Sequence, residues 1–192
     1  MLRWPIDAFA GERNVGYFAV VLSRHDDGWD ANDIDLDGID DLTDLADGMR
    51  ESSELSDIDS TSLLFFEQED AWFAVVRVDG EDDPRVFVSD SDAVGISAYA
   101  EMLLEAAAGA RGASLAIDGL EVEAPADEDE DDDDEPAELE SGPVGDSELL
   151  SDLGTGSEAL LALCAKEGLL PSEILTTLAQ AVGAAEALES VR

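Results

Sequence analysis

Residues 72–88 read WFAVVRVDGEDDPRVFV, two short apolar runs on either side of a polar turn. The runs at 72–78 and 85–88 are rich in valine and aromatic side chains, which favour β-strands. The intervening residues 79–84 contain glycine and proline, which are typical of turns. This segment therefore predicts a β-hairpin, and the rest of the chain can be assigned around it.

Upstream of the hairpin, the sequence predicts three more strands and a helix. Residues 17–24, YFAVVLSR, are apolar on both alternating faces, as expected of a central strand covered on two sides. A turn at 26–28, DDG, lets residues 29–35 return as a second strand. Residues 63–66, LLFF, predict a short buried strand. Between the strands predicted at 29–35 and 63–66 lies a helical pattern, whose apolar face contains Ile39, Leu42, Leu45, Ala46 and Met49.

Downstream of the hairpin, Ser89 and Asp92 resemble a capping box that starts a second helix. That helix ends at Gly109, and its apolar face contains Ile96, Ala100, Leu103 and Ala107. The order ββα-βββ-α predicts an α+β fold with an antiparallel sheet and two helices. Large aromatic side chains are assigned to the core and rim of this fold, with a peptide-binding groove as the alternative: Trp29, Trp72 and Phe87.

The sequence divides into four predicted regions. Residues 1–14 are an N-terminal extension expected to be disordered, and residues 15–111 are the α+β domain. Residues 112–145 form an acidic linker, expected to be largely disordered because its carboxylates repel one another. Residues 146–192 have leucine-rich helical patterning and form a small all-helical module. A module of this size buries little surface, so we expect it to dock on the first domain, self-associate or fold with a partner.

The composition is strongly acidic, with 49 aspartates and glutamates against nine lysines and arginines and a formal net charge of −40. Such a charge repels phosphate backbones and anionic membranes, so direct binding to nucleic acid or to a membrane is not expected. The single cysteine, Cys164, cannot form an internal disulfide, which fits a reducing compartment. No apolar run approaches the roughly 18 residues of a membrane span. These features predict a cytoplasmic protein.

Residues 33–44, DIDLDGIDDLTD, partly match an EF-hand calcium loop. The match places glycine 38 at position 6, and carboxylates at positions 1, 3, 5 and 12, namely Asp33, Asp35, Asp37 and Asp44. Three features oppose it: Asp40 replaces an apolar residue, the last position lacks glutamate, and the preceding segment predicts a strand. The favoured interpretation is therefore a strand followed by a helix start, with no metal. A calcium loop remains the alternative.

Residues suited to catalysis are few. The only histidine, His25, lies beside a turn, so the sequence contains neither a histidine cluster for zinc nor a convincing Ser–His pair. Cys164 lies on an apolar helix and is interpreted as a small buried side chain rather than a nucleophile. The zinc deaminase signature, H-x-E with P-C-x-x-C, is absent. We therefore expect a non-enzymatic protein without a cofactor.

Three blocks of sequence occur together in this chain: YFAVVL at 17–22, WFAVVRVDG at 72–80 and DPRVFVSD at 83–90. They precede a helix, an acidic linker and a small helical C-terminus that contains GPVGD and DLG. In this combination the chain, from about residue 16 to 191, resembles the tRNA adenosine deaminase-associated proteins of high-GC bacteria. The resemblance implies an association with the deaminase and supplies no catalytic residues.

The resemblance makes the deaminase the candidate partner. An enzyme that binds tRNA attracts phosphate with a basic surface, and a flexible polyanion could dock there. The candidate segment is an unbroken acidic run: Asp127, Glu128, Asp129, Glu130, Asp131, Asp132, Asp133, Asp134 and Glu135. A solvated spacer is the alternative interpretation of this run. We predict a non-enzymatic accessory protein; the alternative is a small-ligand or calcium-responsive regulatory module that uses residues 33–44.

Overall fold

The computed structural model describes residues 16–53, 60–93, 97–117 and 142–191 of the chain. The predicted N-terminal extension and the acidic run at 127–135 lie outside these residues. Within the described part, no helix is both long enough and apolar enough to cross a membrane.

The described residues form a six-stranded antiparallel sheet. Its order across the sheet is β2-β1-β3-β4-β5-β6, so β2 and β6 are the edge strands. The strands are β1 (Tyr17–His25), β2 (Gly28–Asp33), β3 (Thr61–Gln68), β4 (Trp72–Asp79), β5 (Arg85–Val88) and β6 (Val144–Gly145). The α+β class and the antiparallel sheet are thereby confirmed, and the hairpin of residues 72–88 corresponds to β4 and β5.

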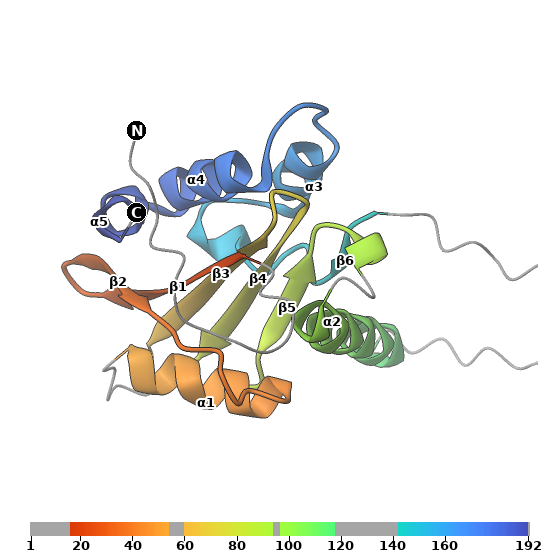
Figure 1. Cartoon of the computed structure of the whole chain (residues 1–192), viewed down its shortest axis with the longest axis horizontal. Helices are drawn as coiled ribbons and strands as arrows, with labels where there is room; N and C mark the ends of the chain where they lie inside the picture. The colour runs from red at the N-terminus through yellow and green to blue at the C-terminus, as the bar shows by residue number, and fades with distance from the viewer. Residues whose placement is uncertain (1–15, 54–59, 94–96, 118–141, 192) are drawn as a thin grey trace, which may run out of the picture.

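Helices cover both faces of the sheet (Figure 1). One face carries α1 (Leu42–Ser52) and α2 (Ala98–Ile117). The other carries α3 (Ser157–Cys164), α4 (Pro171–Val182) and α5 (Ala185–Ser190). Two short 3₁₀ turns complete the described elements, η1 (Ser91–Ala93) and η2 (Ser151–Leu153). The sheet is therefore the middle of three layers.

The alternation of side chains along the strands builds two separate cores. On β3, Leu63 and Phe65 pack beneath the C-terminal helices, whereas Leu64 and Phe66 pack beneath α1 and α2. Trp72 and Phe87 are each only 1% exposed and belong to opposite cores. The double-sided apolar pattern of the central strands has its physical cause here, because neither face of the sheet meets water.

The C-terminal helices pack on the sheet of the N-terminal segment. Leu149, Leu160 and Leu178 are fully buried against Leu22 and Phe65. Of the three outcomes expected for the helical segment, the structure shows docking on the sheet. A segment too small to bury its own apolar face obtains that burial from the sheet.

The segment between β5 and α3 differs from expectation in three places. The predicted helix start at Ser89 is wrong: its Oγ accepts the Phe73 N–H (2.9 Å), and α2 begins at Ala98, where Ser97 Oγ accepts the Ala100 N–H (3.3 Å). The helix also continues past Gly109 and Gly112 to Ile117, because each glycine costs a helix only about 1 kcal/mol. Residues 144–145, assigned to the linker, form β6. Gly145 is required there, since its φ is +105° and a side chain would collide with the Val86 carbonyl.

Candidate interaction surfaces

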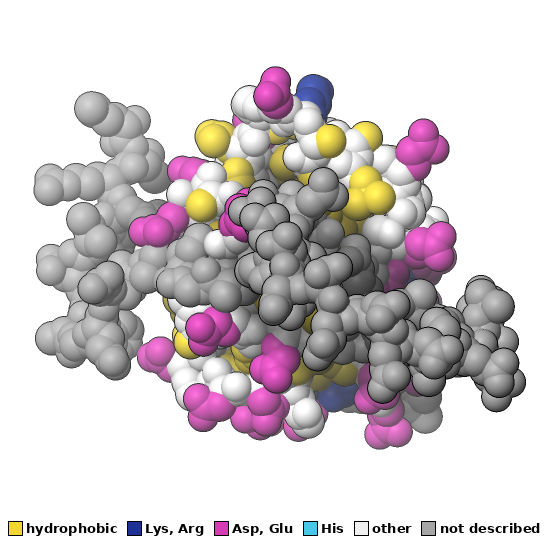
Figure 2. Space-filling view, turned by 90° about the vertical axis from the view of Figure 1, so that its right-hand side faces the viewer, with side chains coloured by type: hydrophobic (Ala, Val, Ile, Leu, Met, Phe, Trp, Pro, Cys, Tyr) yellow, Lys and Arg dark blue, Asp and Glu magenta, His cyan; other side chains and the backbone are white. Residues whose placement is uncertain are grey.

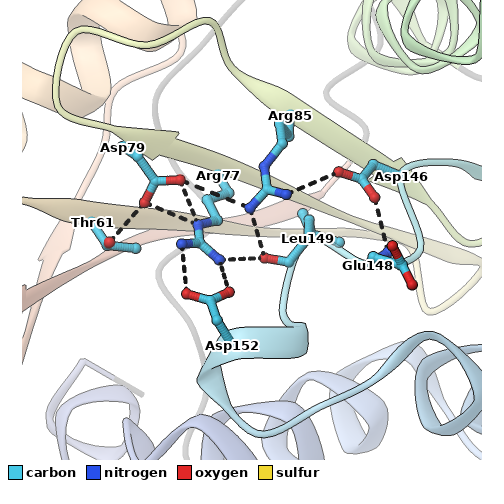
Figure 3. Close-up of polar contacts among 8 residues, drawn as sticks. All are labelled: Thr61, Arg77, Asp79, Arg85, Asp146, Glu148, Leu149 and Asp152. Carbon is cyan, nitrogen blue, oxygen red and sulfur yellow. Dashed lines mark hydrogen bonds and ion pairs between the residues drawn. The ribbon is translucent and has the colours of Figure 1, made fainter. Parts of the chain in front are cut away.

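A buried arginine, Arg77, links the C-terminal segment to the sheet through hydrogen bonds and an ion pair (Figure 3). It lies near the end of β4 and is 6% exposed. Its guanidinium forms a bidentate ion pair with Asp152, in which Nη1 donates to Oδ1 and Nη2 donates to Oδ2 (2.9 Å). Nε donates to Asp79 Oδ2 (2.7 Å), and Nη1 donates to the backbone carbonyl of Leu149 (2.7 Å). One side chain thus satisfies groups from β4 and from the segment that leads into η2.

A second arginine, Arg85 on β5, extends this network. Its Nη1 donates to Asp146 Oδ2 (3.2 Å), and its Nη2 donates to the Leu149 carbonyl (3.3 Å). Asp79 lies 3.8 Å from Arg85 and also accepts a hydrogen bond from Thr61 Oγ1 on β3 (2.7 Å). The network therefore joins three neighbouring strands to the segment that follows β6.

The charges in this network are fixed near neutral pH. The hydrogen bond from Arg77 is the main reason that the pKa of Asp152 is lowered. Burial alone would lower the pKa of Arg77, but its bonds to Asp152 and Asp79 outweigh that penalty and raise it. Both groups stay ionised, so the network suits anchoring rather than proton transfer. Sequence reasoning missed it, although an arginine at an inward position of the run WFAVVRV was the available signal.

The basic side chains are largely used inside the molecule. Arg50 on α1 donates to the carbonyls of Gly80 (3.0 Å) and Asp82 (3.1 Å) as well as to Asp47 (2.9 Å). Of the five Lys and Arg whose side chains are described, three therefore bind internal partners, and the exposed ones are Arg24 and Lys166. Figure 2 shows the result on one face, where acidic side chains are scattered widely and basic ones are few. The described surface therefore carries many acidic side chains and few basic ones.

Two aspartates of residues 33–44, Asp35 and Asp41, accept hydrogen bonds from the backbone. Asp35 Oδ1 accepts the Asp37 N–H (2.9 Å), which closes a turn after β2. Asp41 is the N-cap of α1, because its Oδ1 accepts the N–H groups of Thr43 (2.8 Å) and Asp44 (2.9 Å). Asp33 is the last residue of β2, and Asp44 lies in the first turn of α1. Across the described residues, no group of three or more His, Cys, Asp or Glu side chains is placed to hold a metal ion.

The cap at Asp41 leads to a first prediction. Asp41→Ala should lower the free energy of unfolding by about 1 kcal/mol, because two amide groups at the start of α1 lose their acceptor. Asp40→Ala, the matched exposed neighbour, should change it by less than about 0.5 kcal/mol. Urea unfolding measures both.

Millimolar calcium should leave the thermal midpoint of the unmodified protein unchanged; a clear rise would support the calcium loop instead.

A cleft of about 440 Å³ lies along the edge strand β2. Its floor is residues 29–32, and its walls come from opposite layers: Ser53 at the end of α1, and Glu186, Ala187 and Ser190 of α5. Trp29 is partly buried, and its Nε1 donates to the Val182 carbonyl (3.1 Å) at the end of α4. Asp30 lies at the rim, where its Oδ2 is 3.2 Å from His25 Nε2. Unlike Trp72 and Phe87, Trp29 therefore borders a groove as well as the core.

A second cleft, of about 530 Å³, lies between the end of β5 and α3. It is lined by Ser89, Asp90, Gly142, Pro143, Leu161, Cys164 and Ala165. Leu161 is 39% exposed, while burial raises the pKa of the Cys164 thiol to about 11. Cys164 therefore keeps its proton near neutral pH and is a poor nucleophile there.

Comparison with known proteins identifies a family. A family model described as Rv3753c-like tRNA adenosine deaminase-associated protein matches residues 17–185, which is most of the chain and includes all six strands. No curated protein and no solved structure matches the chain.

Proposed function

The chain belongs to the Rv3753c-like tRNA adenosine deaminase-associated protein family, and we propose that it is a non-enzymatic accessory protein that binds tRNA adenosine deaminase through its acidic surface. The family description names an association with this enzyme and not the deaminase activity itself. The proposal adds physical contact and its chemistry.

The observation that carries the proposal is the unequal use of charge. Arg50, Arg77 and Arg85 donate to carbonyls and carboxylates of the fold itself, which leaves the acids of the surface largely uncompensated. An enzyme that binds tRNA needs a basic surface to attract phosphate. An acidic and a basic surface attract each other over a distance, which speeds their association. The complex that they form should be tightest at low ionic strength.

Within this proposal, the acidic run at 127–135 is the strongest single source of attraction. Nine consecutive carboxylates resemble a nucleic-acid backbone in charge density and would occupy the same basic surface as tRNA. The protein would then act as a competitor of tRNA or as a carrier that shields the basic enzyme. A catalytic contribution is not part of the proposal, because the Cys164 thiol is protonated near neutral pH.

A binding experiment with the deaminase of the same cell tests this function. The unmodified protein should retain the enzyme at low ionic strength and release most of it as salt is raised several-fold. Replacing residues 127–135 with nine glycines and serines keeps the length of the chain and should weaken binding by roughly tenfold or more. A control variant, Glu101→Gln/Glu105→Gln, removes two exposed carboxylates of α2 and should bind nearly as well as the unmodified protein.

The same experiment also includes tRNA as a competitor. Added tRNA should displace the accessory protein from the deaminase, since both would occupy one basic surface. No retention at any salt concentration would contradict contact between the two proteins. Retention that ignores salt and the loss of the run would contradict the polyanion mechanism while leaving an association of another kind.

A further inference from the structure

The outer side of β2 has backbone groups with which no residue of the described ranges pairs. The Glu69 N–H donates to the Gly16 carbonyl (3.2 Å), so residues 16 and 69 form a hydrogen-bonded pair between β1 and β3. In an antiparallel pair every second pair of residues is hydrogen-bonded, so the N–H and C=O of Leu22 face Leu63 on β3. Ala31 lies opposite Leu22 on the other side, so its N–H and C=O point away from β1. The same holds for every second residue of the strand: Trp29, Ala31 and Asp33. No described residue forms a hydrogen bond with these outward backbone groups.

The cleft along β2 has the shape that an additional strand requires. Four consecutive residues, 29–32, line it, so the cavity follows the edge of the strand rather than one face of the sheet. Ser53 and Ala187 border it from opposite layers, which leaves the edge accessible between α1 and α5. Figure 1 shows β2 at the margin of the sheet next to α5.

Charge selects the occupant of this cleft. Asp30 and Glu186 are exposed at its rim, and Asp26, Asp27 and Asp33 lie at the two ends of β2. A second copy of this chain paired through β2 would bring these carboxylates together, which costs free energy. A basic strand would instead find a carboxylate on each side, because successive side chains of a strand point to opposite faces.

We propose that the free edge of β2 accepts an extended basic segment of a partner protein as an additional antiparallel strand. Backbone groups of Trp29 and Ala31 would pair with the segment and provide affinity, as in other cases of strand addition. Basic side chains at successive positions of the segment would reach Asp30 on the side of α1 and Glu186 on the side of α5, and provide specificity. Only the identity of the partner rests on the proposed function; the edge, the cleft and its charge do not.

The test uses the full-length protein and a synthetic peptide, acetyl-VRRVRR-amide, in calorimetric titrations. Neighbouring arginines of this peptide point to opposite faces of a strand. Ala31→Pro removes one outward N–H and leaves the ladder to β1 intact, because proline is tolerated on an edge strand where its nitrogen faces outward. It should weaken peptide binding by roughly tenfold or more, whereas Ala31→Ser, which keeps the N–H, should not. A peptide of the same sequence that is N-methylated at every residue keeps its charges but cannot donate backbone hydrogen bonds. It should bind the unmodified protein as weakly as the parent peptide binds the Ala31→Pro variant.

Charge is tested separately from the backbone. Asp30→Asn/Glu186→Gln should weaken binding and reduce its salt dependence. The matched pair on α2, Glu101→Gln/Glu105→Gln, removes equal charge next to the opposite edge of the sheet and should have a much smaller effect. Hydrogen exchange on the unmodified protein gives an independent measure, since bound peptide should slow exchange of the Trp29 and Ala31 amides.

Several outcomes would overturn the inference. Equal binding of the parent and N-methylated peptides would reduce the effect to unspecific attraction between opposite charges. Unprotected amides at Trp29 and Ala31 would place the peptide elsewhere, and a dimer through β2 would make a second copy the occupant. Failure of this inference is distinct from failure of the proposed function: the deaminase could bind an Ala31→Pro variant normally, or the peptide could bind an edge that the deaminase does not use.

Discussion

A chain that ends at residue 141 is expected not to fold as a monomer. The truncation removes the cover of one whole face of the sheet. Seven side chains on that face are at most 1% exposed in the intact protein: Val20, Leu22, Leu63, Phe65, Phe73, Val75 and Phe87. Exposing a large apolar side chain costs about 1.5–3 kcal/mol. Seven together amount to roughly 10–20 kcal/mol, which matches or exceeds the roughly 5–15 kcal/mol by which a whole domain is stable.

Size-exclusion chromatography, near-ultraviolet circular dichroism and dye binding to exposed apolar surface measure this outcome. The truncated chain should elute as aggregates or as an expanded species, bind the dye and lack fixed aromatic signals. The control is the intact chain with residues 127–135 replaced by glycines and serines, which should unfold at an unchanged urea midpoint. A truncated chain that is monomeric and unfolds cooperatively would establish residues 15–111 as an independent domain.

Arg77→Met should lower the free energy of unfolding by about 3 kcal/mol. The substitution roughly preserves volume but leaves the buried carbonyl of Leu149 with only the weaker contact from Arg85. It also leaves Asp79 and Asp152 without their main cation. Both carboxylates are partly exposed and can be hydrated, so the loss should lie at the lower end of the range for broken buried pairs.

Two controls separate this ion pair from a general loss of charge. Arg50→Met removes an arginine whose side chain is one-third exposed and should cost less than about 1 kcal/mol. A double-mutant cycle of Arg77→Met with Asp152→Asn should show that the two losses are not additive. Additive losses would mean that Arg77 and Asp152 do not stabilise each other.

The dependence of stability on pH offers another measure of the same pair. Because the pKa of Asp152 is lowered in the folded protein, its stabilising contribution is present above the ordinary aspartate value. That contribution is lost as the pH falls through the lowered pKa. In Arg77→Met the lowering should disappear, so the acid side of the stability profile should flatten.

Local patterns predicted the elements whose causes are local. The strand pattern of 17–24, the hairpin of 72–88 and the helical face around Leu45 each contain their own periodicity, and the structure confirms them. The prediction of a helix cap at Ser89 is wrong because a serine hydroxyl can accept hydrogen bonds in several structural settings. Here it accepts one from Phe73, which lies sixteen residues earlier in the chain and beside it only once β4 and β5 pair.

The candidate surfaces were less accessible to sequence reasoning. The bond from Trp29 to Val182 joins residues 153 positions apart, and the pair of Arg77 with Asp152 spans 75. With 49 acids in the chain, no pattern could indicate which aspartate meets a given arginine. The acidic run at 127–135, in contrast, was visible from the letters alone, and its role as a docking polyanion remains a proposal.

The sequence by itself determined the charge, the antiparallel strands and the helices, because charge follows from composition and periodicity follows from which faces meet water. Only the tertiary structure decided that the C-terminal helices complete the core, that Arg77 turns inward and that no described residue pairs with the outer edge of β2. These features depend on contacts between distant segments. Such contacts form where burial and ion pairing offset the entropy of ordering the chain, and no local stretch of sequence records that balance.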